Sequence, residues 1–253
     1  MRRTGRSCTV VPATSANGGT RHDQTTVALT RVYEDSSDKG ARLRVVVAGA
    51  NGQIGQHLVR LLAENGHEVR AMIRSEDQAQ LMRDLGGDPL VADLEEDISD
   101  SAKGCAAAIF TAGGGPGSGD AKKETVDLGG AVKLIETAME HGARRYVMVS
   151  AMGAADPEAG PEGMRPYLRA KARADEALRE SGLDYTVIRP GSLTNEPGTG
   201  RVDAAESLAR RGEIPREDVA RAIVVTLEIQ STIGKTFELL SGDNPIERAL
   251  KAL

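Results

Sequence analysis

The chain has 253 residues, a formal net charge of −5 and 40% hydrophobic residues, which is typical of a globular protein with a full core. The negative charge gives no general attraction to a phosphate backbone, and aromatic residues make up only 2% with no Trp, which disfavours a base-stacking surface for nucleic acid. No apolar run approaches the ~20 residues of a membrane span. We therefore expect a cytoplasmic protein that binds neither nucleic acid nor membrane.

The first 41 residues differ in composition from the rest. They are rich in Thr, Ser, Gly and Asp, keep neither helical nor strand periodicity for long, and lack the continuous apolar segment of a signal peptide. This pattern favours a flexible N-terminal tail over residues 1–41, or a start assigned too early. A single extra strand in "TTVALTRVY" is the alternative. Residues 42–253 are predicted to form one domain.

From residue 42 onward, apolar runs alternate with segments of helical spacing. Gly66, Gly142 and Gly182 stand where helices should end, and Ser75 with Gln78 predicts a capping box. Strands that are almost wholly apolar are covered on both faces, which indicates a parallel sheet. The pattern predicts an α/β fold, a doubly wound parallel sheet with strand order near 3-2-1-4-5-6. The predicted strands are 43–48, 68–73, 89–92, 107–111, 145–150, 185–189 and 236–240.

A glycine-rich turn, "GANGQIG", joins the first predicted strand to a helix. Gly49 should allow the sharp turn, Gly52 the close approach of a phosphate, and Gly55 close packing of the helix. The free N–H groups and the dipole of that helix start favour an anion. Because the strand, the helix and a second strand follow at the required distances, the turn predicts a dinucleotide-binding site.

The end of the second predicted strand bears on which dinucleotide binds. An acidic residue there would accept a hydrogen bond from the ribose of NAD, but this chain has Arg74 followed by Ser75. An arginine can form bidentate, charge-assisted bonds to a 2′-phosphate. The sequence therefore favours NADP(H), with an ordinary surface arginine as the alternative.

Several motifs occur in a fixed order along the chain: "GANGQIG", "VADL", "FTAGG", "YVMVSAMGA", "YLRAK" and "DYTVIRPGSLTNE". This series resembles the atypical short-chain dehydrogenases/reductases, the NAD(P)-binding Rossmann proteins of the NmrA-like and epimerase-like kind. The resemblance covers about residues 43–242. It is specific for fold and cofactor and less specific for the reaction.

The resemblance implies a set of site residues. A catalytic Ser, Tyr and Lys of this family match Ser150, Tyr167 and Lys171, and the family's usual Asn is replaced by Asp127, which puts its usual proton relay in doubt. An ordinary helix residue is the alternative role for Asp127. The implied cofactor-binding residues are Gly49, Asn51, Gly52, Gln53, Ile54, Gly55, Arg74, Ser75, Asp93, Leu94, Ala112, Gly113, Tyr167, Lys171, Pro190, Gly191 and Leu193.

Physical chemistry independently supports the Tyr and Lys pair. Pro166 can occupy the first turn of a helix, which would place Tyr167 and Lys171 one turn apart on the same face. A tyrosine hydroxyl transfers protons poorly at neutral pH unless a nearby cation assists it. Ser150, at the carboxyl end of a predicted strand, could hold a substrate carbonyl oxygen beside Tyr167.

The combined pattern predicts an NADP(H)-dependent oxidoreductase that reduces a small carbonyl or quinone-like substrate, with a tyrosine as proton donor. The segment after Pro190 is too short for the large substrate lobe of a nucleotide-sugar epimerase. Two alternatives remain: a redox sensor that binds the dinucleotide without turnover, as NmrA-like proteins do, and a flavin or biliverdin reductase that needs no Tyr acid. A monomer or homodimer is expected.

No metal site is expected from the sequence. The four histidines, His22, His57, His67 and His141, share no spacing, and the two cysteines form no ligand pattern. The acidic run "LEEDISD" at 94–100 is predicted to be a solvated helix start.

Overall fold

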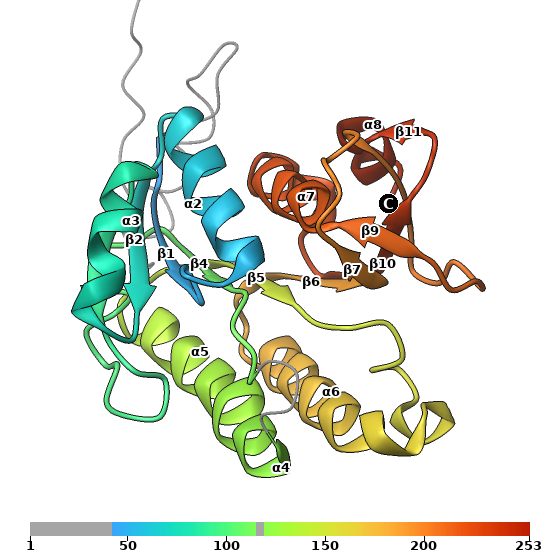
Figure 1. Ribbon diagram of the computed structural model, residues 1–253, viewed down its shortest axis with the longest axis horizontal. Helices are drawn as coiled ribbons and strands as arrows, with labels where there is room; N and C mark the ends of the chain where they lie inside the picture. Colours follow the sequence, from blue (N-terminus) through green and yellow to red (C-terminus); the bar gives the residue numbers. More distant parts are fainter. Residues whose placement is uncertain (1–41, 115–118) are drawn as a thin grey trace, which may run out of the picture. The chain divides into compact units, whose positions relative to one another are not determined.

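The computed structural model describes residues 42–114 and 119–253, so the predicted tail lies outside the described residues (Figure 1). A nine-stranded sheet forms the centre, in the order β11-β8-β10-β6-β5-β4-β1-β2-β3. Its strands are β1 Arg44–Ala48, β2 Glu68–Ile73, β3 Asp88–Val91, β4 Ala107–Phe110, β5 Arg145–Val149, β6 Asp184–Pro190, β8 Arg201–Ala205, β10 Lys235–Ser241 and β11 Asn244–Pro245.

The parallel part of the sheet confirms the predicted topology. Strands β3-β2-β1-β4-β5-β6 are all parallel neighbours, which is the doubly wound order, and β10 extends them beside β6. All seven predicted strands are present, with ends that differ by at most one residue. The carboxyl ends of these strands therefore meet at one edge, where ligands bind in folds of this kind.

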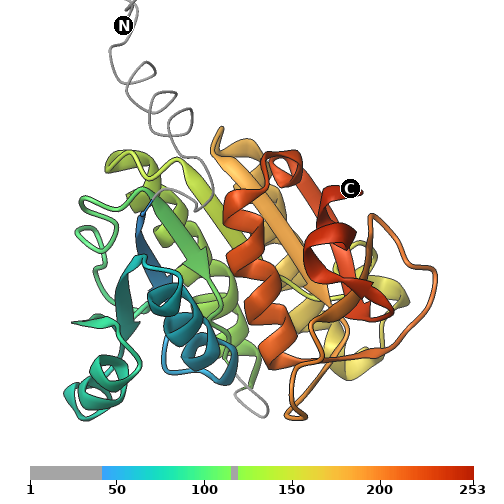
Figure 2. The ribbon, with the colours of Figure 1, turned by 90° about the horizontal axis from the view of Figure 1, so that it is seen from above.

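Helices cover both faces of the sheet (Figures 1 and 2). One face carries α2 Gln53–Glu64, α3 Ala79–Asp84, α7 Arg216–Glu228 and α8 Ile246–Lys251, and the other carries α5 Ala131–Glu140 and α6 Arg165–Glu180. Along β1, Val45 and Val47 pack on the α2 side while Val46 and Ala48 pack on the α5 side. Because successive strand side chains point to opposite faces, an unbroken apolar strand supplies two separate cores.

The segment that follows β6 adds elements that the sequence did not predict. Strands β7 Ser192–Thr194 and β9 Glu213–Pro215 form a small parallel pair, while β8 runs antiparallel to β10 and β11. Their short length and polar positions leave no clear period-2 pattern. They place residues 206–212 beside the carboxyl ends of β6 and β10.

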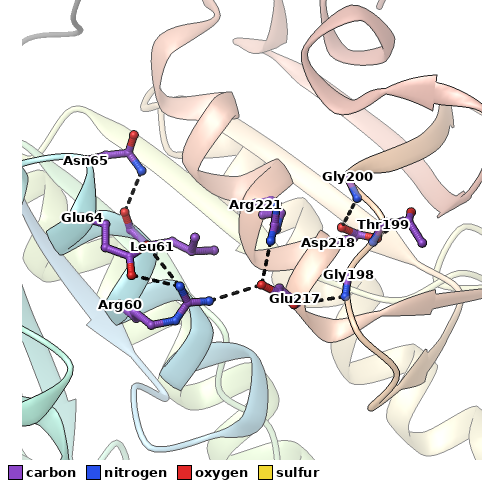
Figure 3. A network of polar contacts seen from close by, with 10 residues as sticks. All are labelled: Arg60, Leu61, Glu64, Asn65, Gly198, Thr199, Gly200, Glu217, Asp218 and Arg221. Atoms are coloured by element: carbon purple, nitrogen blue, oxygen red, sulfur yellow. Dashed lines mark hydrogen bonds and ion pairs between the residues drawn. The ribbon is translucent and has the colours of Figure 1, made fainter.

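Two acids at the start of α7 anchor this C-terminal segment (Figure 3). Asp218 is fully buried and accepts hydrogen bonds from the backbone N–H groups of Thr199 and Gly200, at 2.8 Å each. Glu217 accepts the N–H of Gly198 at 3.0 Å and pairs with Arg221 at 2.8 Å. Glu217 also meets Arg60 of α2 at 3.3 Å, so it ties the segment to the helix that follows the glycine turn.

Two local predictions are wrong. Ser75 precedes a 3₁₀ turn, Glu76–Gln78, but makes no capping bond, because its hydroxyl donates to Asp77 instead. The acidic run 94–100 forms turns rather than a helix start, held in part by Asp97 accepting the N–H of Ser99 at 2.9 Å. In both places a short acidic side chain competes for local hydrogen bonds. No helix within residues 42–114 and 119–253 is long and apolar enough to cross a membrane.

Candidate active site

The glycine turn after β1 has the backbone geometry that only glycine tolerates well. Gly49 has φ of +84°, and a Cβ there would lie 2.7 Å from the backbone N of Ala112 at the end of β4. A Cβ on Gly55 would lie 2.6 Å from the carbonyl O of Ala50 and closer still to that of Gly49. The close approach that requires Gly55 is therefore to the turn's own carbonyls. Gly52 occupies the N-cap of α2.

A cavity of about 430 Å³ opens beside this turn, at the carboxyl ends of β1, β2 and β4. We call it the glycine-loop cavity. Eight of the predicted cofactor-binding residues line it together with eight that were not predicted. The predicted ones are Gly49, Asn51, Gly52, Arg74, Asp93, Leu94, Ala112 and Gly113, and the others are Met72, Ile73, Gln78, Ala92, Thr111, Gly114, Lys122 and Val126.

Two cations line the glycine-loop cavity: Arg74, which follows β2, and Lys122, which ends the short helix 119–122. Arg74 is exposed, and its guanidinium has no hydrogen bond or ion pair with any residue that the structure describes. Lys122 is paired with Glu95, and the hydrogen bonds from Lys122 and Thr125 lower the pKa of the Glu95 carboxyl. Arg74 is therefore the cation of this pair that can meet a bound anion without first breaking an ion pair.

The Lys171 ammonium lies in a nearly closed environment. The residue is 3% exposed, and its Nζ is 3.2 Å from Asp127 Oδ1, 3.3 Å from the carbonyl O of Val149 and 3.4 Å from that of Ala112. It also lies 5.8 Å from the centre of the Tyr167 ring. Because an opposite charge lies against it, the Lys171 ammonium is part of an ion pair and not an isolated cation.

Asp127 comes from a π-helical segment, Lys123–Gly130, that leads into α5. Its side chain is 1% exposed, and Oδ2 accepts the backbone N–H of Gly114 at 2.9 Å. A Cβ on Gly113 would lie 2.9 Å from Oδ1. Asp127 thus holds the strand end that lines the glycine-loop cavity while it pairs with Lys171. Single-turn π segments are frequent at functional sites.

A second cavity, of about 710 Å³, lies at the ends of β5, β6 and β10. We call it the Tyr167 cavity, because the half-buried side chain of Tyr167 lines it. The chain between β5 and α6 and the segment 206–212 supply much of the remaining wall. The predicted residues Pro190 and Gly191 line it as well. Pro166 lies in the first turn of α6 as predicted, and Tyr167 and Lys171 lie one turn apart on this helix.

Ser150 follows β5 directly and is 3% exposed. Its backbone N donates to Ile188 at 2.7 Å, but its hydroxyl lacks hydrogen-bond geometry to any described residue. Ser150 lines neither cavity, whereas the next residue, Ala151, lines the Tyr167 cavity. The structure brings Ser150 to the sheet edge beside the site without placing its hydroxyl at a cavity wall.

A buried ion pair behind this edge was missed by the sequence analysis. Asp175 on α6 is fully buried, and its Oδ2 accepts from Arg189 Nε at 3.0 Å and Nη2 at 2.8 Å. Burial raises the pKa of the Asp175 carboxyl, while Arg189 and the nearby Ser150 hydroxyl oppose that rise. Two features of the sequence could have indicated this pair. Asp175 lies on an apolar face of the helix one turn after Lys171, and Arg189 lies inside the apolar run of β6.

Six predicted cofactor-binding residues line neither cavity, and Lys171, described above, is one of them. Ile54 is buried in the core under α2, Gly55 meets the glycine turn, and Leu193 packs against the core from β7. Gln53 and Ser75 are exposed. Exposed residues such as Gln53 and Ser75 can contact a ligand at the edge of a cavity. The cofactor-binding roles of these residues stay predictions.

Comparison with known proteins gives the family. The model of the NAD(P)H-binding family matches residues 49–229. An uncharacterized sugar epimerase of Bacillus subtilis is 48% identical over 215 residues, which cover 83% of this chain and all of that protein. This chain belongs to the NAD(P)H-binding family.

Solved structures share the fold. A provisionally named NAD-dependent epimerase/dehydratase from Bacillus halodurans is 45% identical with a TM-score of 0.81, covering 83% of this chain and 100% of that one. An oxidoreductase from Lactococcus lactis is 28% identical with a TM-score of 0.75, covering 83% and 96%. These similarities agree with the glycine turn and the cavity beside it.

Proposed function

We propose that this chain is an NADP(H)-dependent oxidoreductase that reduces a small carbonyl or quinone-like substrate. The observation that carries the proposal is the position of Lys171. Its ammonium contacts Ala112, which lines the glycine-loop cavity, and lies beside the ring of Tyr167, which lines the second cavity. A cofactor site and a substrate site are thereby joined through one side chain.

The glycine-loop cavity fits a dinucleotide. Gly49 and Gly52 remove side chains where a phosphate would approach, and the N-terminus of α2 offers unpaired N–H groups. Arg74 supports NADP(H) over NAD(H), because its guanidinium has no partner among the described residues. When bound, the nicotinamide supplies the hydride.

The chain's own residues would supply the proton and hold the substrate. Tyr167 donates its hydroxyl proton to the oxygen of the carbonyl under reduction. Lys171 and Asp127 form a charge pair behind the tyrosine, so that Asp127 offsets the charge that Lys171 would otherwise present. Ser150 lies at the same sheet edge, where its hydroxyl would donate to the same carbonyl oxygen.

The test is stopped-flow oxidation of NADPH with a panel of aldehydes, ketones and quinones. Tyr167→Phe should keep NADPH affinity and lower the rate of hydride transfer by about 10²–10⁴-fold. The matched control is Tyr185→Phe, the same change at a half-buried tyrosine on β6 outside both cavities. NADPH binding with no turnover of any carbonyl would support a redox sensor instead. An unchanged rate of hydride transfer in Tyr167→Phe would show that Tyr167 is not the proton donor.

An epimerase is the second candidate, because the 48% identical relative is named a sugar epimerase. Oxidation and re-reduction of one substrate would use the same Tyr167 and cofactor site, with no net consumption of NADPH. Stoichiometric loss of NADPH absorbance with a carbonyl substrate would support the reductase, whereas isomerisation of a sugar without that loss would support the epimerase.

A further inference from the structure

The Tyr167 cavity has two chemically different walls. The wall formed by residues 151–168 is largely apolar and includes side chains that are partly or well exposed. Met164 is the clearest case, since 45% of this large hydrophobic residue is exposed. A compound with an apolar body would cover such a wall. The apolar lining residues are Ala151, Met152, Ala155, Ala159, Pro161, Met164 and Leu168.

Another wall of the cavity carries two arginines in succession, and only one of them has an ion-pair partner among the described residues. Arg210 Nη2 lies 2.7 Å from Asp203 Oδ2, which fixes it against β8. Arg211 also lines the cavity and is exposed, and its side chain makes no hydrogen bond or ion pair with residues 42–114 or 119–253.

The acids that line the cavity already have partners. Glu238 accepts the backbone N–H of Leu208 at 2.7 Å, and Asp156 accepts that of Ala159 at 3.3 Å. Arg211 is therefore the charged group of this cavity whose hydrogen-bonding capacity is unused within the described chain. A guanidinium in this state matches the two oxygens of a carboxylate.

The residue before the two arginines, Ala209, has an unusual backbone conformation. Ala209 has φ of +51°, the single non-glycine residue with positive φ among those the structure describes. This region is disfavoured for an L-residue, so the surrounding contacts must stabilise it. The bonds from Leu208 N to Glu238 and from Arg210 to Asp203 lie on either side of Ala209. A strained residue of this kind persists only where the surrounding structure fixes the backbone. The backbone that carries Arg210 and Arg211 is therefore held in place.

We infer that the substrate of the Tyr167 cavity is an apolar carbonyl compound bearing a carboxylate, and that Arg211 binds this carboxylate. The carbonyl group of this substrate is inferred from the proposed function. The carboxylate is inferred from Arg211 and the lining of the cavity, whatever reaction takes place there. Arg211 is a specificity residue here, since it meets the charged end of the substrate and Tyr167 meets the reacting end.

Binding can be measured without any hydride transfer. The protein saturated with NADPH is titrated by calorimetry with 4-(hydroxymethyl)benzoate and with its neutral amide, both of which are already reduced. The carboxylate should bind on the order of ten-fold more tightly than the amide. Arg211→Gln should bring the two affinities to within about two-fold, and Arg211→Lys should restore part of the preference.

The matched control is Arg248→Gln, which removes an exposed arginine on α8 that makes no hydrogen bond or ion pair with the described residues and lies outside both cavities. It should leave the preference for the carboxylate intact. Equal affinities for acid and amide in the unmodified protein, absence of binding by both, or a preference that survives Arg211→Gln would each overturn the inference.

The same compounds separate this inference from the proposed function. Reduction of 4-formylbenzoate with a KM that rises about ten-fold in Arg211→Gln, at little changed kcat, would support both. Carboxylate binding that depends on Arg211 without reduction of the aldehyde would keep the anion site and reject the reductase. Reduction of neutral aldehydes with no Arg211 dependence would keep the reductase and reject the anion site.

Discussion

The glycine-loop cavity is formed largely by strand ends and a turn that are close together in the first half of the chain, whereas the Tyr167 cavity collects side chains from segments between residues 151 and 238. The first depends on backbone geometry, as the positive φ of Gly49 and the close contact of Gly55 show. The second depends on particular side chains held by separate loops. A site made of backbone leaves a glycine motif in the sequence, but a site made of dispersed side chains leaves no compact motif.

The largest effect is expected at Lys171, which lies near Ala112 of one cavity and Tyr167 of the other. Asp127→Ala would leave the Lys171 ammonium buried without its carboxylate, which should lower the free energy of unfolding by about 3–5 kcal/mol in urea denaturation. The control is Glu247→Ala, which breaks an exposed pair with Lys251 and should cost less than about 1 kcal/mol. Similar small losses in both variants would show that Asp127 and Lys171 are not a coupled buried pair.

The dependence of the glycine-loop cavity on backbone can be tested at Gly55. Gly55→Ala would force the carbonyls of Gly49 and Ala50 to move, and we expect a loss of about 3 kcal/mol together with weaker cofactor binding. Gly142→Ala is the control, since its φ is +73° but a Cβ there meets nothing within 4 Å; it should cost about 1 kcal/mol with no loss of cofactor affinity. Equal effects on cofactor affinity would contradict this account.

A side chain should nonetheless set the choice of dinucleotide. Arg74→Ala is expected to remove about 1.5–3 kcal/mol of binding to NADPH and to leave NADH affinity nearly unchanged, because only the 2′-phosphate meets the guanidinium. Calorimetric titration with both cofactors measures the difference. Arg83→Ala, at an exposed arginine of α3 that lines neither cavity, should change neither affinity. Equal binding of NADPH and NADH by the unmodified protein would refute the prediction.

The smallest effect concerns the tie between the two regions. Hydrogen bonds from Arg221 and from the Gly198 N–H lower the pKa of Glu217 from 4.5 to about 2. A carboxyl with a depressed folded pKa stabilises the protein above its unfolded pKa, and this contribution disappears as the pH falls from 4.5 toward 2. Because the arginines are partly exposed, we expect Glu217→Gln to cost about 1–2 kcal/mol at pH 7.

The measurement is the difference in unfolding free energy between the two proteins across that pH range. The difference should be constant above about pH 5 and should vanish toward pH 2. If the difference in unfolding free energy grew as the pH fell, the Glu217 carboxylate would not be the stabilising group.

How far the sequence predicts this molecule follows from the same physical distinction. The strands β1 to β6 and β10 were predicted because unbroken apolar runs identify doubly covered strands, and the glycine motif identified much of the first cavity. Lys122 was not predicted, because a single lysine at the end of a short helix carries no periodic signal. Arg211 was missed for a related reason, since its place in the cavity depends on β8 pairing with a strand about 30 residues later.

Local hydrogen bonding accounts for the errors. The predicted capping box at Ser75 assumed that its hydroxyl would meet the helix backbone, but Asp77 lies nearer and takes the bond. The ion pair of Asp127 with Lys171 was also beyond sequence reasoning, because it depends on how the π-helical segment turns the carboxylate inward. Neither contact has a spacing that distinguishes it from an ordinary helix position.

The pairing of β8 has a consequence for the order in which the molecule is made. Strand β8 lies between β10 and β11, so among the described strands its partners are synthesised only after residue 234. A nascent chain that has reached β6 already contains every residue of the glycine-loop cavity. The wall that carries Arg211 follows β8, and the partner strand β10 has not yet been synthesised at that point. The residues of the glycine-loop cavity are therefore synthesised well before the final strands, whereas the wall that carries Arg211 is completed only when those strands emerge.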